Sequence, residues 1–248
     1  MTVVLIISAI ALALVILIVF GYQRVSMQRQ ASFEGIESPE VVNAYNRISR
    51  WPQFKFLRHL VVRELKTYHP SGVLVDVGCG PGYFIKAMAK SLPQLHLVGV
   101  DIAQDMIQQA ASNMSSSETG IRVDFRQGNV QELPFEDGTV DFVISTFSLH
   151  HWSQPGQALR EIHRVLKPQG QFLIFDLRRD ARRCFYWLLH FAQAFVVPPP
   201  MRTVNEPTSS ARAAYTPHEV EAFLTRTPFQ QHEIKSRTAW MFVWGLKD

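Results

Sequence analysis

The stretch Val73–Phe84 most strongly constrains what this chain can fold into. Its first five residues, V-L-V-D-V, are apolar apart from one acid, which is typical of a short strand buried on both faces. Three glycines follow at once, and apolar residues then recur every three or four positions, as on one face of a helix. The order strand, glycine turn, helix brings backbone N–H groups and a helix N-terminus to the carboxyl end of a strand. There they can bind the polar groups of a small ligand.

The spacing of the glycines distinguishes two classes of nucleotide-binding fold. A nicotinamide-binding fold has G-x-G-x-x-G, but counted from Gly78 and Gly80 the third position is Tyr83, so this fingerprint is not met. The chain has D-x-G-x-G-x-G from Asp76 to Gly82. In this motif it resembles the class I S-adenosylmethionine-dependent methyltransferases. For the glycine motif taken alone, a plain loop is the alternative.

Further motifs extend the resemblance over roughly Val73–Asp176. The strand L-H-L-V-G-V ends at Asp101, where the family places the acid that binds the ribose. A third predicted strand, Ile121–Gln127, leads to Asn129, where the family usually has an Asp beside the adenine. The amide carbonyl of an Asn can still accept from the adenine amino group. Stretches that resemble the family's fourth strand, next helix and fifth strand follow at 133–152 and 159–176.

The alternation of strands and helices predicts an α/β fold with a Rossmann-like, seven-stranded, mostly parallel sheet. Phe229–Arg237 and Ala239–Leu246 resemble the family's closing antiparallel strand pair. We expect a membrane anchor over residues 1–22, a linker over 23–37 and one methyltransferase domain over 38–248. The helices predicted before the first strand resemble the family's lid over the site; alternatively they only pack on the sheet.

The N-terminal segment Val3–Phe20 contains eighteen residues without a charge. At about 1.5 Å per residue it is about 27 Å long, close to the hydrocarbon thickness of a bilayer, which predicts a transmembrane helix. A cleaved signal peptide and a buried core helix are the alternatives, but no basic residue precedes the run. Basic residues begin only at Arg24. The positive-inside rule therefore predicts a single-pass membrane protein whose catalytic domain faces the cytosol.

The resemblance implies S-adenosylmethionine as the cofactor. Its amino-acid end is expected at the glycine turn, its ribose at the end of the second strand and its adenine beside the end of the third. The cofactor-binding candidates are Asp76, Gly78, Cys79, Gly80, Gly82, Asp101, Ile102, Met106, Asn129, Val130 and Ser145. The Cys and His spacings of a zinc site are absent from the sequence, and we predict no metal.

Methyl transfer from a sulfonium needs alignment of the reactants and exclusion of water, and a base is optional. Where the acceptor is a hydroxyl or a thiol, a histidine near neutral pKa can remove its proton. His150 and His151 follow the fourth strand and are the catalytic candidates; the alternative is a packing or substrate-shaping role. Tyr45 and His218 are weaker candidates.

The sequence also restricts the acceptor. After the fourth strand it has S-T-F-S-L-H-H where enzymes acting on base amines or glutamine amides resemble one another in an N-P-P-Y-like turn. No nucleic-acid module is recognisable. The chain resembles the small-molecule branch, similar to the ubiquinone/menaquinone biosynthesis methyltransferases, so we expect a small, hydrophobic acceptor drawn from a membrane. The alternative function is a non-catalytic, membrane-tethered scaffold or cofactor sensor.

The segment Ala181–Val197 is apolar around most of a helix circumference, with basic residues at one end. It is a core helix, a lid over the substrate or an interfacial helix lying on the bilayer. Pro198–Arg212 is predicted to be an irregular loop. Thr216 and Glu219 form a capping box that starts the next helix.

Overall fold

The computed structural model describes residues 15, 18–31, 38–115 and 123–248. The helices are α2 (Pro39–Ile48), α3 (Pro52–Lys66), α4 (Tyr83–Ser91), α5 (Gln104–Ser115), the 3-10 helix η1 (Leu149–His151), α6 (Pro155–Val165), α7 (Arg183–Phe195), α8 (Pro199–Thr203), α9 (Thr208–Ala213) and α10 (Pro217–Leu224). The strands are β1 (Val73–Val77), β2 (His96–Asp101), β3 (Val123–Gln127), β4 (Val140–Thr146), β5 (Leu166–Leu177), β6 (Gln231–Ser236) and β7 (Trp240–Leu246).

The strands form one sheet in the order β3-β2-β1-β4-β5-β7-β6. β1 to β5 pair in parallel, whereas β7 pairs antiparallel with both β5 and β6. The predicted Rossmann-like sheet with an antiparallel C-terminal pair is therefore confirmed. The strand order reverses between β1 and β4, and ligands of such sheets bind at the carboxyl ends of the strands at this switch point.

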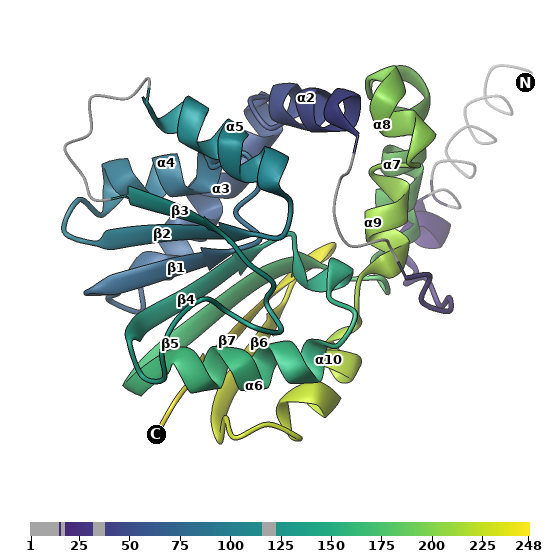
Figure 1. Cartoon of the computed structure of the whole chain (residues 1–248). Helices are drawn as coiled ribbons and strands as arrows, with labels where there is room; N and C mark the ends of the chain where they lie inside the picture. Colours follow the sequence, from purple (N-terminus) through teal and green to yellow (C-terminus); the bar gives the residue numbers. More distant parts are fainter. Residues whose placement is uncertain (1–14, 16–17, 32–37, 116–122) are drawn as a thin grey trace, which may run out of the picture.

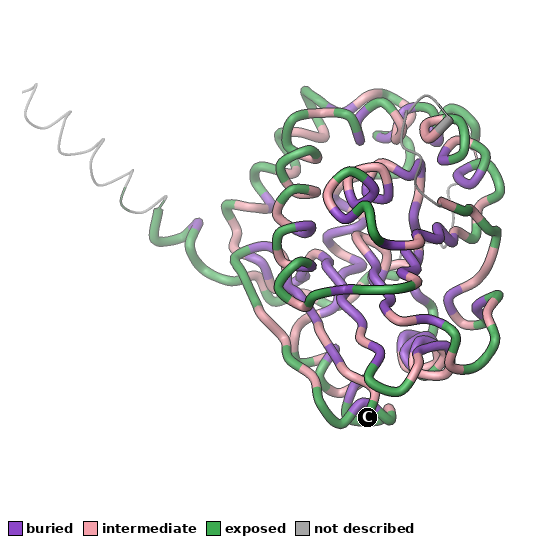
Figure 2. Tube along the Cα trace, turned by 90° about the vertical axis from the view of Figure 1, so that its left-hand side faces the viewer, coloured by how far each residue is buried: buried purple, intermediate pink, exposed green. Residues whose placement is uncertain are grey.

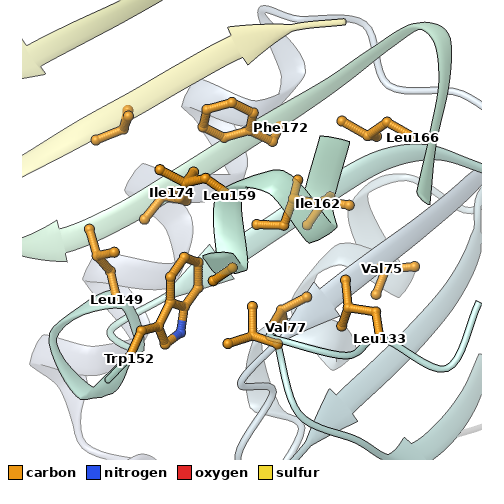
Figure 3. Close-up of a cluster of buried hydrophobic side chains, with 14 of the residues drawn as sticks. Val75, Val77, Leu133, Leu149, Trp152, Leu159, Ile162, Leu166, Phe172 and Ile174 are labelled. Carbon is orange, nitrogen blue, oxygen red and sulfur yellow. The ribbon is translucent and has the colours of Figure 1, made fainter. Parts of the chain in front are cut away.

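Helices cover both faces of the sheet (Figure 1), as the buried strands require. One apolar cluster joins the sheet to α6 and α10, and a second joins it to α3 and α4. Figure 2 shows the buried segments gathered inside a shell of exposed helices and loops. In the first cluster (Figure 3), Leu149 and Trp152 are only 1% and 3% exposed. Leu149 begins η1 and Trp152 follows it, so these two core side chains fix the chain after β4.

Several predicted boundaries differ from the structure. In α7 only Tyr186 is buried, so the core-helix interpretation of Ala181–Val197 is wrong. The segment predicted as a loop after it contains α8 and α9; prolines at the first positions of α8 favour a helix start. β5 is long, from Leu166 to Leu177, and Leu166 pairs with Val140 at its start. The capping box is present: the Thr216 hydroxyl accepts from the Glu219 N–H, and the Glu219 carboxylate accepts from the Thr216 N–H.

The predicted linker is described over residues 23–31, where it lies along the domain. The Val25 N–H donates to the Ala181 carbonyl at 2.9 Å, and the Gln30 N–H donates to the Arg212 carbonyl at 3.1 Å. This part of the chain is therefore a docked segment rather than a free connection.

The predicted transmembrane helix falls mainly on residues 1–14 and 16–17, which lie outside the described residues. Across the described ranges, no helix combines the length and the apolar character needed to cross a bilayer.

Candidate functional site

The glycine turn joins β1 to α4 at the switch point of the sheet. Gly78, Gly80 and Gly82 all have positive φ, at 75°, 52° and 76°, a conformation that glycine adopts without steric cost. The N–H groups of Gly78 and Cys79 donate to the Val100 carbonyl at 2.8 and 3.0 Å. The turn is thereby tied to the end of β2.

Asp101, at the end of β2, lies directly against this turn. One carboxylate oxygen accepts from the Gly80 N–H at 2.8 Å, and the other accepts from the Ala103 N–H at 3.0 Å. Burial raises the pKa of Asp101, and these backbone N–H groups offset only part of that effect. The structure therefore brings together the predicted ribose acid and the predicted turn. Because a carboxylate has about four acceptor positions, it can still accept from two hydroxyl groups.

Asp76, on β1 just before the turn, is only 1% exposed. Among the described residues, neither of its carboxylate oxygens has a hydrogen-bond partner. Burial, followed by the charge of Asp101, raises the pKa of Asp76 to about 8. Native proteins rarely leave a buried carboxyl group without partners, because such burial is costly. The carboxyl group fits a cationic ligand group, and the α-amino group of S-adenosylmethionine is such a group.

A pocket opens above the turn. Its lining includes Gly78, Cys79, Gly80, Tyr83, Thr146, Phe147, Phe175, Tyr45 and Arg58, from the turn, the ends of β4 and β5, and the helices α2 and α3. A Cβ added at Gly80 would lie 3.7 Å from Tyr45 Cε1, which places this α2 side chain over the turn. The helices before β1 thus cover the site, as in the lid interpretation. Burial raises the pKa of Tyr45 to about 12, so it remains an uncharged phenol.

Sequence reasoning did not select Arg58 or Thr146. Arg58 Nη1 donates to the Ser49 carbonyl at 2.7 Å, which holds α3 to the end of α2. Arg58 shares a helical stripe with Phe54, Val61 and Leu65, at spacings of four, three and four residues. A basic residue within an otherwise apolar helical stripe could have marked Arg58 as a candidate site residue.

The adenine-side candidates differ in their surroundings. Ile102 is 41% exposed, whereas Met106 is 4% exposed. The side-chain oxygen Oδ1 of Asn129 accepts from the Gln131 N–H at 2.9 Å, and Val130 is buried in the core cluster that includes β1. Asn129 therefore already uses its carbonyl within its own turn.

Two further cofactor candidates, Ser145 and Gly82, make contacts that hold elements of the fold together. The Ser145 side chain is fully buried, and its hydroxyl donates to the Val77 carbonyl at 2.8 Å, so it joins β4 to β1. Thr146, the next residue, points to the other face and lines the pocket. A Cβ at Gly82 would lie 3.0 Å from the Ala110 Cβ, so this glycine allows α5 to approach α4. The Ser145 hydroxyl is therefore engaged within the sheet.

His150 forms a buried pair with Asp176, which ends β5. Its Nδ1 lies 2.7 Å from Asp176 Oδ1, and its backbone N–H donates to Asp176 Oδ2 at 2.9 Å. His150 Nε2 is buried and has no hydrogen-bond partner in the described chain. Burial lowers the pKa of His150, but the charge and hydrogen bond of Asp176 outweigh burial and raise it above its usual value. A histidine oriented by a carboxylate, with its second nitrogen unengaged, has the arrangement of a general base.

The other candidate bases are less suited. The His151 ring lies 4.1 Å from the His150 ring, measured between centroids, and is partly exposed. None of the three histidines is among the residues that line the pocket. His218 is exposed on α10, whereas His150 and His151 lie in η1, which follows β4 directly. Asp176 was not predicted as a site residue, although an acid that ends the apolar strand F-L-I-F-D was a usable signal.

Comparisons with known proteins agree with this geometry. Residues 75–174 match a family model described as "Methyltransferase domain". This part of the chain is similar to a methyltransferase domain. The chain is 29% identical over 172 residues to the ubiquinone/menaquinone biosynthesis C-methyltransferase UbiE of Syntrophotalea carbinolica, covering 69% of this chain and 70% of that protein. It is 35% identical over 104 residues to the demethylmenaquinone methyltransferase of Lactiplantibacillus plantarum, covering 42% and 44%.

Other curated relatives are covered over 36%, 40% and 60% of their lengths, so the chain spans about half the length of these proteins. Two solved structures share the fold. An S-adenosylmethionine-dependent methyltransferase from Aquifex aeolicus has a TM-score of 0.61 at 19% identity, covering 86% of this chain and all of that one. The plantazolicin methyltransferase BpumL, solved with S-adenosylhomocysteine and a desmethyl substrate analogue, has a TM-score of 0.65 at 17% identity, covering 85% and 92%. Together the matches show that the chain is similar to methyltransferases and shares the fold of S-adenosylmethionine-dependent members.

Two glycines of the methyltransferase motif offer a matched test of the turn. A Cβ at Gly78 would lie 2.3 Å from Ser148 Oγ, whereas a Cβ at Gly80 meets nothing closer than 3.7 Å. Both substitutions by Ala force a left-handed backbone, at about 1–2 kcal/mol each. We expect Gly78→Ala to lower the free energy of unfolding by clearly more than Gly80→Ala, because Ser148 must also move. Urea unfolding of the two variants measures the difference; equal losses would contradict the contact.

Proposed function

We propose that this chain is a membrane-anchored methyltransferase that moves the methyl group of S-adenosylmethionine to a small, hydrophobic acceptor. The observation that carries the catalytic part is the buried His150–Asp176 pair, in a segment whose Ser148 lies against Gly78 of the turn. The names of the relatives above suggest the acceptor class, because ubiquinone and menaquinone precursors are apolar ring compounds with hydroxyl groups.

The cofactor supplies an electrophilic methyl group on a sulfonium, whose charge is lost in the transfer. In our proposal Asp76 binds the amino group of the cofactor, Asp101 accepts from its ribose hydroxyls, and the turn at Gly78 and Gly80 allows close approach. Arg58 is the one positively charged side chain in the described pocket lining and is assigned to the cofactor carboxylate. The N–H groups of the turn already bond to Val100 and Asp101, so they shape the turn rather than hold the ligand.

His150 is proposed to take the proton of an acceptor hydroxyl or thiol onto Nε2. Asp176 orients the ring through Nδ1 and stabilises the imidazolium that forms. Deprotonation raises the electron density of the acceptor, which favours attack on the methyl group. Tyr45, Phe147 and Phe175 exclude water from this space. His151 has a shaping role in this scheme, beside His150.

We propose the membrane anchor from the uncharged sequence of Val3–Phe20, and we place the domain on the cytosolic side of the membrane. The full chain expressed in cells should remain in the membrane fraction after alkaline carbonate extraction. A protein deleted for residues 1–17 should be extracted. Release of the full chain by carbonate would contradict a spanning segment.

Turnover by the full chain in detergent tests the enzyme assignment. With S-adenosylmethionine and a panel of quinols, phenols and thiols, we expect S-adenosylhomocysteine and a methylated product from at least one hydroxylated aromatic ring. Cofactor binding without turnover on any acceptor would favour the scaffold or sensor alternative. Absence of cofactor binding in calorimetry would refute the cofactor assignment itself.

A further inference from the structure

Helix α7 presents large apolar side chains to solvent along one face. Trp187, Leu188, Phe191 and Phe195 are 40%, 61%, 58% and 74% exposed. Their spacing of one, three and four residues places them on a single stripe, and Cys184, also exposed, begins it. We call residues 184, 187, 188, 191 and 195 the α7 stripe. The opposite face of α7 holds the buried Tyr186 and packs toward α9. An apolar stripe of this kind marks an interaction surface.

The described end of the N-terminal segment lies against the start of this stripe. The rings of Phe20 and Trp187 are stacked with centroids 6.2 Å apart. Gly21 is buried, and a Cβ added there would lie 2.8 Å from the Trp187 ring. The apolar sequence Val3–Phe20 therefore ends where the stripe begins. The two apolar features are adjacent, and one surface can cover both.

The charge around the stripe identifies that surface. No acidic residue occurs in 1–33 or in 181–205, whereas both stretches contain arginines. The guanidinium groups of Arg182 and Arg183 lie 3.0 and 3.9 Å from the ring centroids of Tyr22 and Phe20. Aromatic and basic side chains together are typical of the interface of an anionic bilayer. A second copy of the chain fits less well, because pairing two stripes would bring these arginines together.

We infer that the α7 stripe lies in the interfacial layer of an anionic bilayer. The domain is then held at two places, by the segment before Phe20 and by the stripe. Because α7 packs on α9 and α9 packs on η1, this contact turns the η1 side of the domain, which carries His150, toward the membrane. The inference extends the proposed anchor but does not depend on methyl transfer. It selects the interfacial alternative for this helix.

Spin labels on the full chain test the contact. Cys184 is exposed and Cys79 is buried, so a nitroxide reagent labels the stripe without substitution. A second label is placed by Phe195→Cys in a Cys184→Ser background, and a control label by Phe56→Cys on α3, where Phe56 is 61% exposed. In vesicles of phosphatidylglycerol and phosphatidylcholine, collision with oxygen and with a water-soluble nickel chelate should place both stripe labels roughly 5–10 Å below the phosphates. The control label should remain accessible to nickel.

A double variant, Leu188→Glu/Phe191→Glu, should return the Cys184 label to water, whereas Phe56→Glu should not. Circular dichroism and binding of S-adenosylhomocysteine check that each variant is folded. Stripe labels as exposed to nickel as the control label would overturn the inference. Dipolar broadening between stripe labels would also overturn it, because it would show a second copy on the stripe. Carbonate extraction tests the anchor separately, so the two proposals can fail independently.

Discussion

Replacing Asp76 with Asn should weaken binding of S-adenosylmethionine about 30-fold or more, the effect of losing one partner of a buried charge pair, about 2 kcal/mol or more. The substitution keeps the size of the side chain and removes only its ability to become an anion. Isothermal titration calorimetry with S-adenosylmethionine and S-adenosylhomocysteine measures the loss.

The pH dependence of this binding follows from the pKa of Asp76, which burial raises to about 8. Near pH 7 the free protein holds this proton, and a bound ammonium group favours the carboxylate, so binding releases close to one proton. The cofactor affinity should therefore rise roughly tenfold between pH 6 and pH 7. Titrations in buffers of different ionisation enthalpy count the released proton. Asp76→Asn should release none, and an unchanged proton count in this variant would contradict the assignment.

The same shift predicts the stability of the unliganded protein. Because the folded protein holds a proton that the unfolded chain loses near pH 4, the stability contribution of protonated Asp76 is complete below that pH. It is lost as the pH rises toward about 8. The free energy of unfolding of Asp76→Asn should lack this part of the decline. Urea unfolding at pH 6 and pH 8 compares the two proteins.

Replacing His150 with Ala should lower kcat by roughly 10²–10⁴, the usual contribution of a general base, while cofactor affinity remains unchanged. Its base form is the neutral ring, and Asp176 raises its pKa above the ordinary value. At saturating S-adenosylmethionine, the kcat/KM of the wild type for the acceptor should therefore rise with pH, with a midpoint above that value. Methylation rates from pH 5.5 to 9 define the curve.

The variant Asp176→Asn distinguishes catalysis from packing. It removes the charge that raises the pKa of His150, so the midpoint of the profile should move to lower pH and the maximal rate should fall. A purely structural pair would lower the amount of folded protein without moving the midpoint. His218→Ala, at an exposed histidine of α10, is the matched control and should leave both parameters unchanged. Loss of activity in His218→Ala would contradict the assignment of His150 as the general base.

The features that sequence predicted well are those determined by local pattern. The strand, turn and helix around Gly78 follow from an apolar run and glycine spacing, and strand order then places Asp101 at the turn. Alternate residues of a strand point to opposite faces, so a shift of one residue decides whether Ser145 or Thr146 faces the pocket; Thr146 is the one that lines it. Because β4 is buried on both faces, its apolar sequence does not show which face a polar residue such as Ser145 occupies.

The features that sequence missed depend on contacts between distant segments. His150 and Asp176 are 26 residues apart and meet only because β4 and β5 pair in parallel. Arg58 reaches the pocket because α3 folds back beside the turn. The docking of residues 23–31 has no periodic sequence signal, because it depends on backbone hydrogen bonds and on single side chains such as Arg29.

The docked N-terminal segment has a practical consequence for protein production. Arg29 donates to the His150 carbonyl at 2.9 Å and to the Ala213 carbonyl at 2.6 Å, and its guanidinium lies 4.1 Å from the Tyr215 ring centroid. A truncation that starts at Ser38, just before α2, would remove Arg29 and its contacts with the His150 and Ala213 carbonyls. Water-soluble fragments intended for crystallisation or screening should therefore keep the chain from Gln23 onward.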